Sequence, residues 1–116
     1  SPKLRSSVPF NTDFEKMHEK NRINTDVLRV YNTLKEENKA DVQWKFVFTS
    51  IDDIKEIREL QSEVGFADKN VFLMPEGISK EDLNKNRLKT IEACLKNNFN
   101  YTDRLHIVVW GNKRGV

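Results

Sequence analysis

Four short segments of the chain carry groups that could bind a ligand, either polar side chains or an irregular backbone that can present its own N–H and C=O groups. They are Ser1-Pro2-Lys3, the Thr49-Ser50 step, Met74-Pro75-Glu76-Gly77 and the last six residues, 111–116. Between them they offer hydroxyls, cations, a carboxylate and a backbone made irregular by proline and glycine. Such groups bind small polar molecules. No nucleophile beside a base, phosphate-binding loop or dinucleotide fingerprint accompanies them, so we predict binding residues and no catalytic residue.

Apolar runs and helix signals indicate the elements that position these segments. Three runs predict strands, at Val42–Ser50, Val71–Gly77 and Leu105–Trp110. Helices are predicted to begin at Asn24-Thr25, after Ser50 and after Ser79, the last two with an Asp three residues after the Ser. The predicted inner faces of these last two helices consist of Ile51, Ile54, Ile57, Leu60 and Val64, and of Leu83, Leu88, Ile91 and Leu95.

The alternation of these elements predicts an α/β fold, with a parallel sheet covered by helices. Crossovers between parallel strands are right-handed, and ligands gather at the carboxyl ends of the strands. All four polar segments are therefore expected on one rim of the sheet. The polar stretch at residues 11–24 shows no apolar period, and we interpret it as a loop or a short helical turn.

Lys45 is a cation inside an apolar strand and must find a partner or reach water. Because side chains alternate along a strand, Gln43, Lys45 and Val47 share one face. Lys45 then either points into a polar barrel interior or extends along the edge strand to solvent. The pattern leaves both alternatives open.

Other candidates have ordinary structural interpretations. Met74 to Gly77 is either a ligand-binding backbone or a plain turn from strand to helix, and the local pattern favours the turn. His106 lies on an apolar stretch, where a hydrogen-bonded core histidine is more common than a ligand. Cys94 is predicted to pack in the core. A carboxylate at Val116, held at the rim, could accept paired N–H groups, while an exposed basic tail is the alternative.

Composition excludes several classes of protein. The 116 residues carry a net charge of +2 with 33% charged residues, which argues against a dedicated nucleic-acid binder. No apolar run is long enough to span a membrane. The single cysteine excludes a disulfide framework or an all-cysteine metal site and fits a reducing cytoplasm. Because Ser1 follows no Met, we expect a truncated N-terminus.

The segments SPKL, KFV and VFLMPEG, a helix containing AC, and RLHIVVWGNKRGV at the end resemble a known family. Taken in this order, they are similar to the C-terminal half of 7-carboxy-7-deazaguanine synthases, which are radical S-adenosylmethionine enzymes of queuosine biosynthesis. The resemblance runs from Ser1 to Val116 and is weakest across residues 8–40.

The resemblance implies a partial (β/α) barrel, usually in a homodimer, that converts 6-carboxy-5,6,7,8-tetrahydropterin into 7-carboxy-7-deazaguanine. It implies S-adenosylmethionine, a [4Fe–4S] cluster and Mg²⁺ as cofactors. S-adenosylmethionine would contact Ser1, Pro2, Lys3, Met74, Pro75, Glu76 and Gly77. The pterin would contact Val116, with Lys45 and His106 as further candidates.

The family holds its cluster with three cysteines near the N-terminus, and this chain has Cys94 alone, in the wrong place. We therefore expect residues 1–116 to be a single C-terminal part that lacks its cluster-binding half and is inactive alone. A free-standing α/β ligand-binding module is the alternative. A nucleic-acid binder using Arg104, Lys113 and Arg114 is a third reading, disfavoured by the balanced charge.

Overall fold

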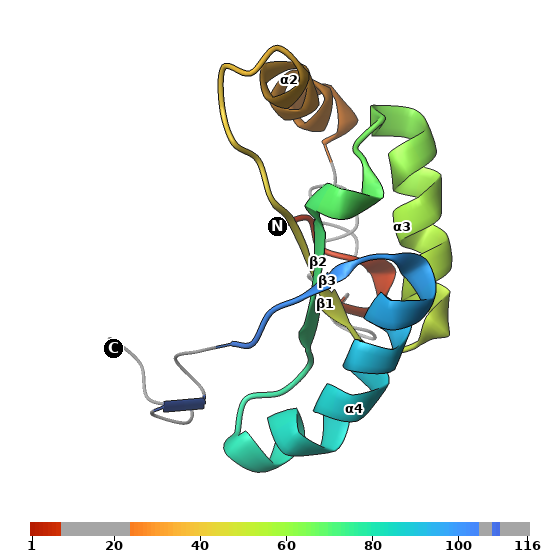
Figure 1. Cartoon of the computed structure of the whole chain (residues 1–116). Helices are drawn as coiled ribbons and strands as arrows, with labels where there is room; N and C mark the ends of the chain where they lie inside the picture. Colours follow the sequence, from red (N-terminus) through yellow and green to blue (C-terminus); the bar gives the residue numbers. More distant parts are fainter. Residues whose placement is uncertain (8–23, 105–107, 110–116) are drawn as a thin grey trace, which may run out of the picture.

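The computed structural model describes residues 1–7, 24–104 and 108–109. Within them the elements run in the order η1 (Arg5–Ser7), α2 (Thr25–Glu36), β1 (Trp44–Phe48), α3 (Ile51–Val64), η2 (Asp68–Asn70), β2 (Val71–Pro75), α4 (Lys80–Asn97) and β3 (Asn100–Tyr101). The three strands form a parallel sheet in the order β1-β2-β3, with helices α3 and α4 as the crossovers (Figure 1). The α/β class and the parallel pairing are confirmed, and the predicted helical cover is confirmed for one face of the sheet.

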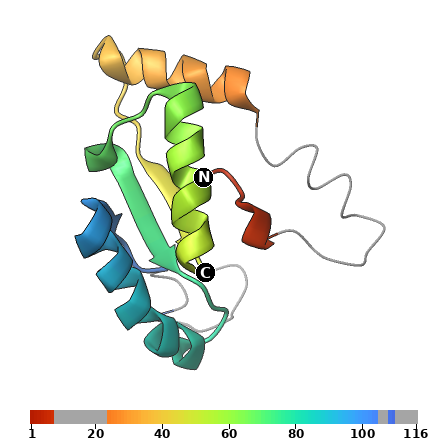
Figure 2. The ribbon, with the colours of Figure 1, turned by 90° about the vertical axis from the view of Figure 1, so that its right-hand side faces the viewer.

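Helices α3 and α4 both lie on the same side of the sheet (Figures 1 and 2). Their buried residues meet the strand face that carries Trp44, Phe46 and Phe48. Phe66, which follows α3, stacks on Trp44 with ring centroids 4.4 Å apart. The core is therefore one-sided and aromatic, and it holds the helices against one face of the strands.

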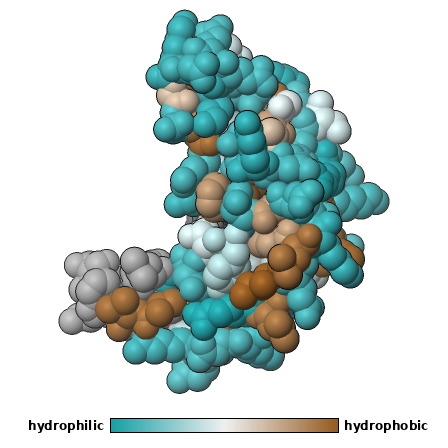
Figure 3. Space-filling model, viewed as in Figure 1, coloured by the Kyte–Doolittle hydropathy of each residue, from teal (hydrophilic) through white to brown (hydrophobic). Residues whose placement is uncertain are grey.

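The opposite face of the sheet has a different character. Its residues, which include Lys45, Val47, Phe72 and Met74, are only half-buried. The space-filling view is hollowed on the side turned away from α3 and α4 (Figure 3). This alternation confirms that Lys45 and Val47 share a face separate from that of the buried aromatics.

The predicted helix ends are largely confirmed. Asn24 caps α2 by accepting the backbone N–H of Val27 at 3.2 Å. The carboxylate of Asp53 accepts the backbone N–H of Thr49 at 2.7 Å and that of Ser50 at 3.2 Å, which fixes the turn from β1 into α3. Gly65 ends α3 with a φ of 99°, in the left-handed region that suits glycine.

The predicted inner faces of the helices need correction. Leu88 and Leu95 are 66% and 77% exposed, and Ile51 is 74% exposed. Leu83 and Cys94 are buried as predicted, and the third buried residue of α4 is Thr90. The buried hydroxyl of Thr90 has its hydrogen-bond partner within the helix, because Thr90 Oγ1 donates to the carbonyl of Asn86 at 2.8 Å.

The last predicted strand is wrong for the residues that the structure describes. Val108 and Val109, from the middle of the predicted strand Leu105–Trp110, are helical, and Val108 N–H donates to the Arg104 carbonyl at 3.1 Å. The third strand lies earlier, at β3. Asn98 ends α4 with a φ of 57°, and the reversal brings Asn100 beside β2.

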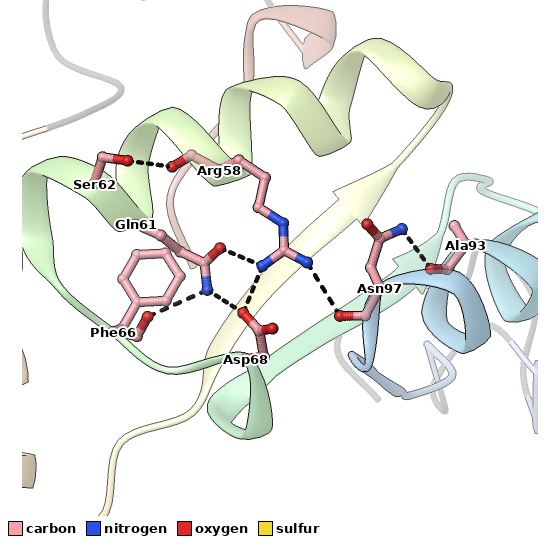
Figure 4. Close-up of polar contacts among 7 residues, drawn as sticks. All are labelled: Arg58, Gln61, Ser62, Phe66, Asp68, Ala93 and Asn97. Carbon is pink, nitrogen blue, oxygen red and sulfur yellow. Dashed lines mark hydrogen bonds and ion pairs between the residues drawn. The ribbon is translucent and has the colours of Figure 1, made fainter.

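A polar cluster ties α3, η2 and the end of α4 together at the amino ends of the strands (Figure 4). Arg58 donates to the side chains of Asp68 and Gln61 and to the Asn97 carbonyl. Its guanidinium also lies 4.6 Å from the centroid of the Phe99 ring. This end of the sheet is thus closed by structural contacts, and the carboxyl end is left for ligands.

Candidate functional site

The site lies where strands β1 and β2 end. Phe48 is opposite Pro75 in the parallel register, so the residues that follow them, Thr49 and Glu76, leave the sheet at the same edge. A cavity of about 600 Å³ opens there, within the size range of small-molecule sites. Its lining comprises Ser1, Pro2, Lys3, Leu4, Ser6, Val47, Thr49, Glu76, Gly77, Ile78, Asp82, Lys85, Asn86 and Arg104.

The segment Ser1-Pro2-Lys3 is held beside β1 and reaches this cavity. Ser1 Oγ donates to the Lys45 carbonyl at 3.1 Å, and Pro2 is buried. Just after this segment, the backbone N–H of Arg5 donates to Glu56 Oε1 at 2.8 Å. The Glu56 side chain is itself buried in α3. The core and a buried carboxylate therefore fix where the hydroxyl and cation of this segment lie.

The turn after β2 forms the facing wall. Glu76 is exposed, whereas Gly77 is buried and has a φ of 152°. Ser79 Oγ then accepts the backbone N–H of Asp82 at 3.2 Å and begins α4. The first two turns of that helix place Asp82, Lys85 and Asn86 on the cavity.

The charges around the cavity are mixed. Lys3, Lys85 and Arg104 supply cations, and Glu76 and Asp82 supply carboxylates. Such a lining suits a ligand that carries both signs of charge and several hydrogen-bonding groups.

Three of the four predicted rim segments thus meet. Ser1-Pro2-Lys3, Thr49 and Glu76-Gly77 line one cavity, which confirms the predicted rim for these segments. Met74 and Pro75 precede the turn in β2 and do not line the cavity. Lys45 is half-buried on the open face beside Val47 but is not among the lining residues. His106, Val116 and the stretch 110–116 lie outside the described residues.

Sequence reasoning missed most of the helical wall. Asp82, Lys85 and Asn86 follow the spacing i, i+3, i+4 at the start of the helix after MPEG, and this spacing could have revealed them. Arg104 had no such local signal, because its place depends on the short strand β3.

The donor sets of the described residues do not fit an iron–sulfur cluster. Cys94 Sγ lies 3.3 Å from the Asn100 carbonyl oxygen as a hydrogen-bond donor, and burial raises the pKa of the thiol. A cluster ligand must be a thiolate, which this setting disfavours. Residues 1–7, 24–104 and 108–109 also contain no group of three or more His, Cys, Asp or Glu side chains placed to hold a metal ion.

In fold and site, the described residues form an α/β protein with a cavity at the carboxyl ends of a parallel sheet. The chain is 36% identical over 121 residues to the 7-carboxy-7-deazaguanine synthase of Rhodopirellula baltica, an alignment covering 100% of this chain and 45% of that protein. It is 31% identical over 125 residues to the 7-carboxy-7-deazaguanine synthase of Halobacterium salinarum, covering 97% of this chain and 47% of that protein. The synthase of Pyrobaculum aerophilum with the same name is 36% identical over 72 residues.

These similarities confirm the resemblance to 7-carboxy-7-deazaguanine synthases along the whole chain. The chain spans less than half the length of each of these relatives. No family model and no solved structure matches it. No helix among the described residues is long and apolar enough to cross a bilayer.

Proposed function

We propose that this chain is the C-terminal, cofactor- and substrate-binding part of a 7-carboxy-7-deazaguanine synthase. The complete enzyme would convert 6-carboxy-5,6,7,8-tetrahydropterin into 7-carboxy-7-deazaguanine. The observation that carries the proposal is the convergence of Ser1-Pro2-Lys3 and Glu76-Gly77 on one rim cavity. The chain that forms this cavity is similar along its whole length to a 7-carboxy-7-deazaguanine synthase.

The proposed ligand of the cavity is S-adenosylmethionine, which would supply the radical when a reduced cluster is present. Its methionyl carboxylate, ammonium and ribose hydroxyls call for cations and carboxylates within one pocket. Lys3 provides a cation and Glu76 a carboxylate on facing walls of the cavity. In this assignment the chain binds and orients the cofactor and shields it from water.

The one-sided helical cover supports a larger barrel. Parallel sheets are normally covered on both faces or closed into barrels. Here the face that carries Lys45 and Met74 has no helix of the described residues against it (Figures 1 and 2). We propose that this face lines the interior of a partial (β/α) barrel whose first half, with the cluster-binding cysteines and Mg²⁺, comes from outside these 116 residues.

Substrate contacts from Lys45, His106 and Val116, and the pairing of two complete subunits, stay predictions within this proposal. The alternative, a free-standing α/β ligand-binding module, needs a complete sheet, whereas one face of this sheet has no helix of the described residues against it (Figures 1 and 2). A nucleic-acid binder would use Arg104 as a contact, but the Arg104 guanidinium donates to the Gly77 carbonyl at 2.8 Å.

The test uses the enzyme that contains this chain together with its cluster-binding part. We expect it to bind S-adenosylmethionine and to form 7-carboxy-7-deazaguanine from the carboxypterin. Lys3→Met should weaken cofactor binding by roughly 10- to 100-fold, because a charge-assisted hydrogen bond contributes about 1.5–3 kcal/mol. Lys55→Met is the matched control, since Lys55 is exposed on α3 and does not line the cavity. Equal affinities for the two variants, or no product from the unaltered enzyme, would contradict the proposal.

A further inference from the structure

The turn after β2 is unusually constrained for a surface turn. Gly77 is buried, and a Cβ placed on it would lie 2.5 Å from Asp82 Cβ and 3.1 Å from the Leu83 backbone nitrogen. The backbone of the turn is therefore packed directly against the first turn of α4. The peptide groups of such a turn also need hydrogen-bond partners, because a backbone polar group that is buried without one costs free energy.

Two side chains, one from α4 and one from beyond β3, donate hydrogen bonds to consecutive carbonyls of this turn. Asn86 Nδ2, in the second turn of α4, donates to the Glu76 carbonyl at 2.7 Å. Arg104 Nη1, which lies beyond β3, donates to the Gly77 carbonyl at 2.8 Å. Both donors line the same cavity as the turn itself. Each peptide of the Glu76-Gly77 step is thus fixed by a separate structural element.

Arg104 is in turn held in place by the residues just before it. Tyr101 belongs to β3, and its hydroxyl donates to Asp103 Oδ1 at 2.6 Å. The guanidinium of Arg87, on α4, donates to the same carboxylate oxygen at 3.2 Å and to the Tyr101 hydroxyl at 3.2 Å. This network holds residues 101–104 against α4. The backbone of Arg104 is therefore held at a defined distance from the Gly77 carbonyl.

We propose that Asn86 and Arg104 are positioning residues that hold the Glu76-Gly77 turn in the conformation that binds S-adenosylmethionine. The assignment rests on the proposed function, because it is the proposed cofactor that gives the turn its role. Neither residue needs to touch the reacting atoms. Their effect passes through the two carbonyls, which fix the direction of the Glu76 side chain and of the peptide N–H groups at the cavity.

Asn86→Asp tests the first contact in the complete enzyme. The change keeps the size of the side chain but replaces the donor with an oxygen that faces the Glu76 carbonyl. We expect the Kd and KM for S-adenosylmethionine to rise roughly tenfold, with kcat within about twofold and the Tm of the ligand-free protein almost unchanged. Asn84→Asp is the matched control, because it makes the same change on the same helix. Asn84 does not line the cavity, and it serves as an acceptor for Arg87, which an aspartate can also do.

Arg104 provides a second, independent variant. Arg104→Met should raise the same Kd, and Arg104→Lys should restore most of the affinity, because a lysine can still donate to the Gly77 carbonyl. Equal Kd values for Asn86→Asp and Asn84→Asp overturn the assignment, and so does a fall in Tm without a change in Kd. An unaltered enzyme that does not bind S-adenosylmethionine at all would instead refute the proposed function, so the two failures can be told apart.

Discussion

Replacement of Gly77 by Ala separates a steric requirement from a conformational one. The chain offers an internal comparison, because Gly65 and Gly77 both have a positive φ, at 99° and 152°. At Gly65 the nearest atom to an added Cβ is Asn32 Nδ2, the end of a side chain, at 3.3 Å. At Gly77 it is Asp82 Cβ at 2.5 Å, with backbone atoms of Asp82 and Leu83 just beyond. The first site can adjust to a methyl group, and the second cannot.

These contacts give different costs in the free energy of unfolding. A non-glycine residue forced to a left-handed φ costs about 1–2 kcal/mol, which is the whole expectation for Gly65→Ala. At Gly77 the backbone region costs about 1–3 kcal/mol, and overpacking against the helix start adds about 1–3 kcal/mol. We therefore expect Gly77→Ala to cost roughly 4 kcal/mol, well above the cost of Gly65→Ala.

Equilibrium urea denaturation, followed by circular dichroism with both variants in one buffer, measures this difference. The m-value should be unchanged, so that the shift in midpoint reports stability alone. If Gly77→Ala loses no more stability than Gly65→Ala, then the turn after β2 does not pack against α4 as described. The positioning role given to this turn would then have no structural basis.

Three further changes test other parts of the structure. Leu73→Ala should lower the free energy of unfolding by about 2–5 kcal/mol, because this side chain is fully buried in β2, and thermal denaturation measures the loss. Glu56→Ala should cost about 1.5–3 kcal/mol and raise the Kd for S-adenosylmethionine, because it leaves the Arg5 N–H without its acceptor; an unchanged Kd would contradict the link to Ser1-Pro2-Lys3. A hydrogen bond from Gln61, followed by one from Arg58, lowers the pKa of Asp68, so the charge of Asp68 stabilises the fold above the unfolded pKa of about 3.9. The free energy of unfolding of the unaltered protein should therefore approach that of Asp68→Asn as the pH falls below about 3.9 and through the lower pKa of Asp68 in the folded protein. Urea titrations at several pH values measure this difference.

The parts of the fold that follow local chemistry could be predicted from the sequence. β1 and β2 were visible as short runs of β-branched and aromatic residues, and the ends of α3 and α4 as Ser50, Gly65 and Ser79. From these elements the parallel order and the shared rim follow by general rules of α/β topology. The meeting of Ser1-Pro2-Lys3 with Glu76-Gly77 was predictable for this reason.

Only part of the inner face of α4, Leu83, was predictable from hydrophobicity. Thr90 is fully buried and satisfies its hydroxyl on the carbonyl one turn back, whereas Leu88 and Leu95 point outward. A periodicity argument counts apolar residues and cannot see a polar residue that hydrogen-bonds within its own helix. The same limitation hides Asn86, whose amide is used at the cavity and not in solvent.

The position of the third strand shows where an apolar run is ambiguous. Residues 105–110 are apolar enough for a buried strand or a helix, and their length does not decide between the two. The position is decided by Asn98, which turns the chain back at once, and by Asn100, whose amide donates to the carbonyls of Lys69 at 2.8 Å and Val71 at 3.0 Å. These side-chain bonds align β3 with the start of β2, so the chain meets the sheet five residues before the apolar run begins. Because β3 ends at Tyr101, Asp103 and Arg104 lie at the carboxyl end of the sheet, and Arg104 lines the cavity. A strand at 105–110 would have placed Arg104 before the strand, at the opposite end of the sheet.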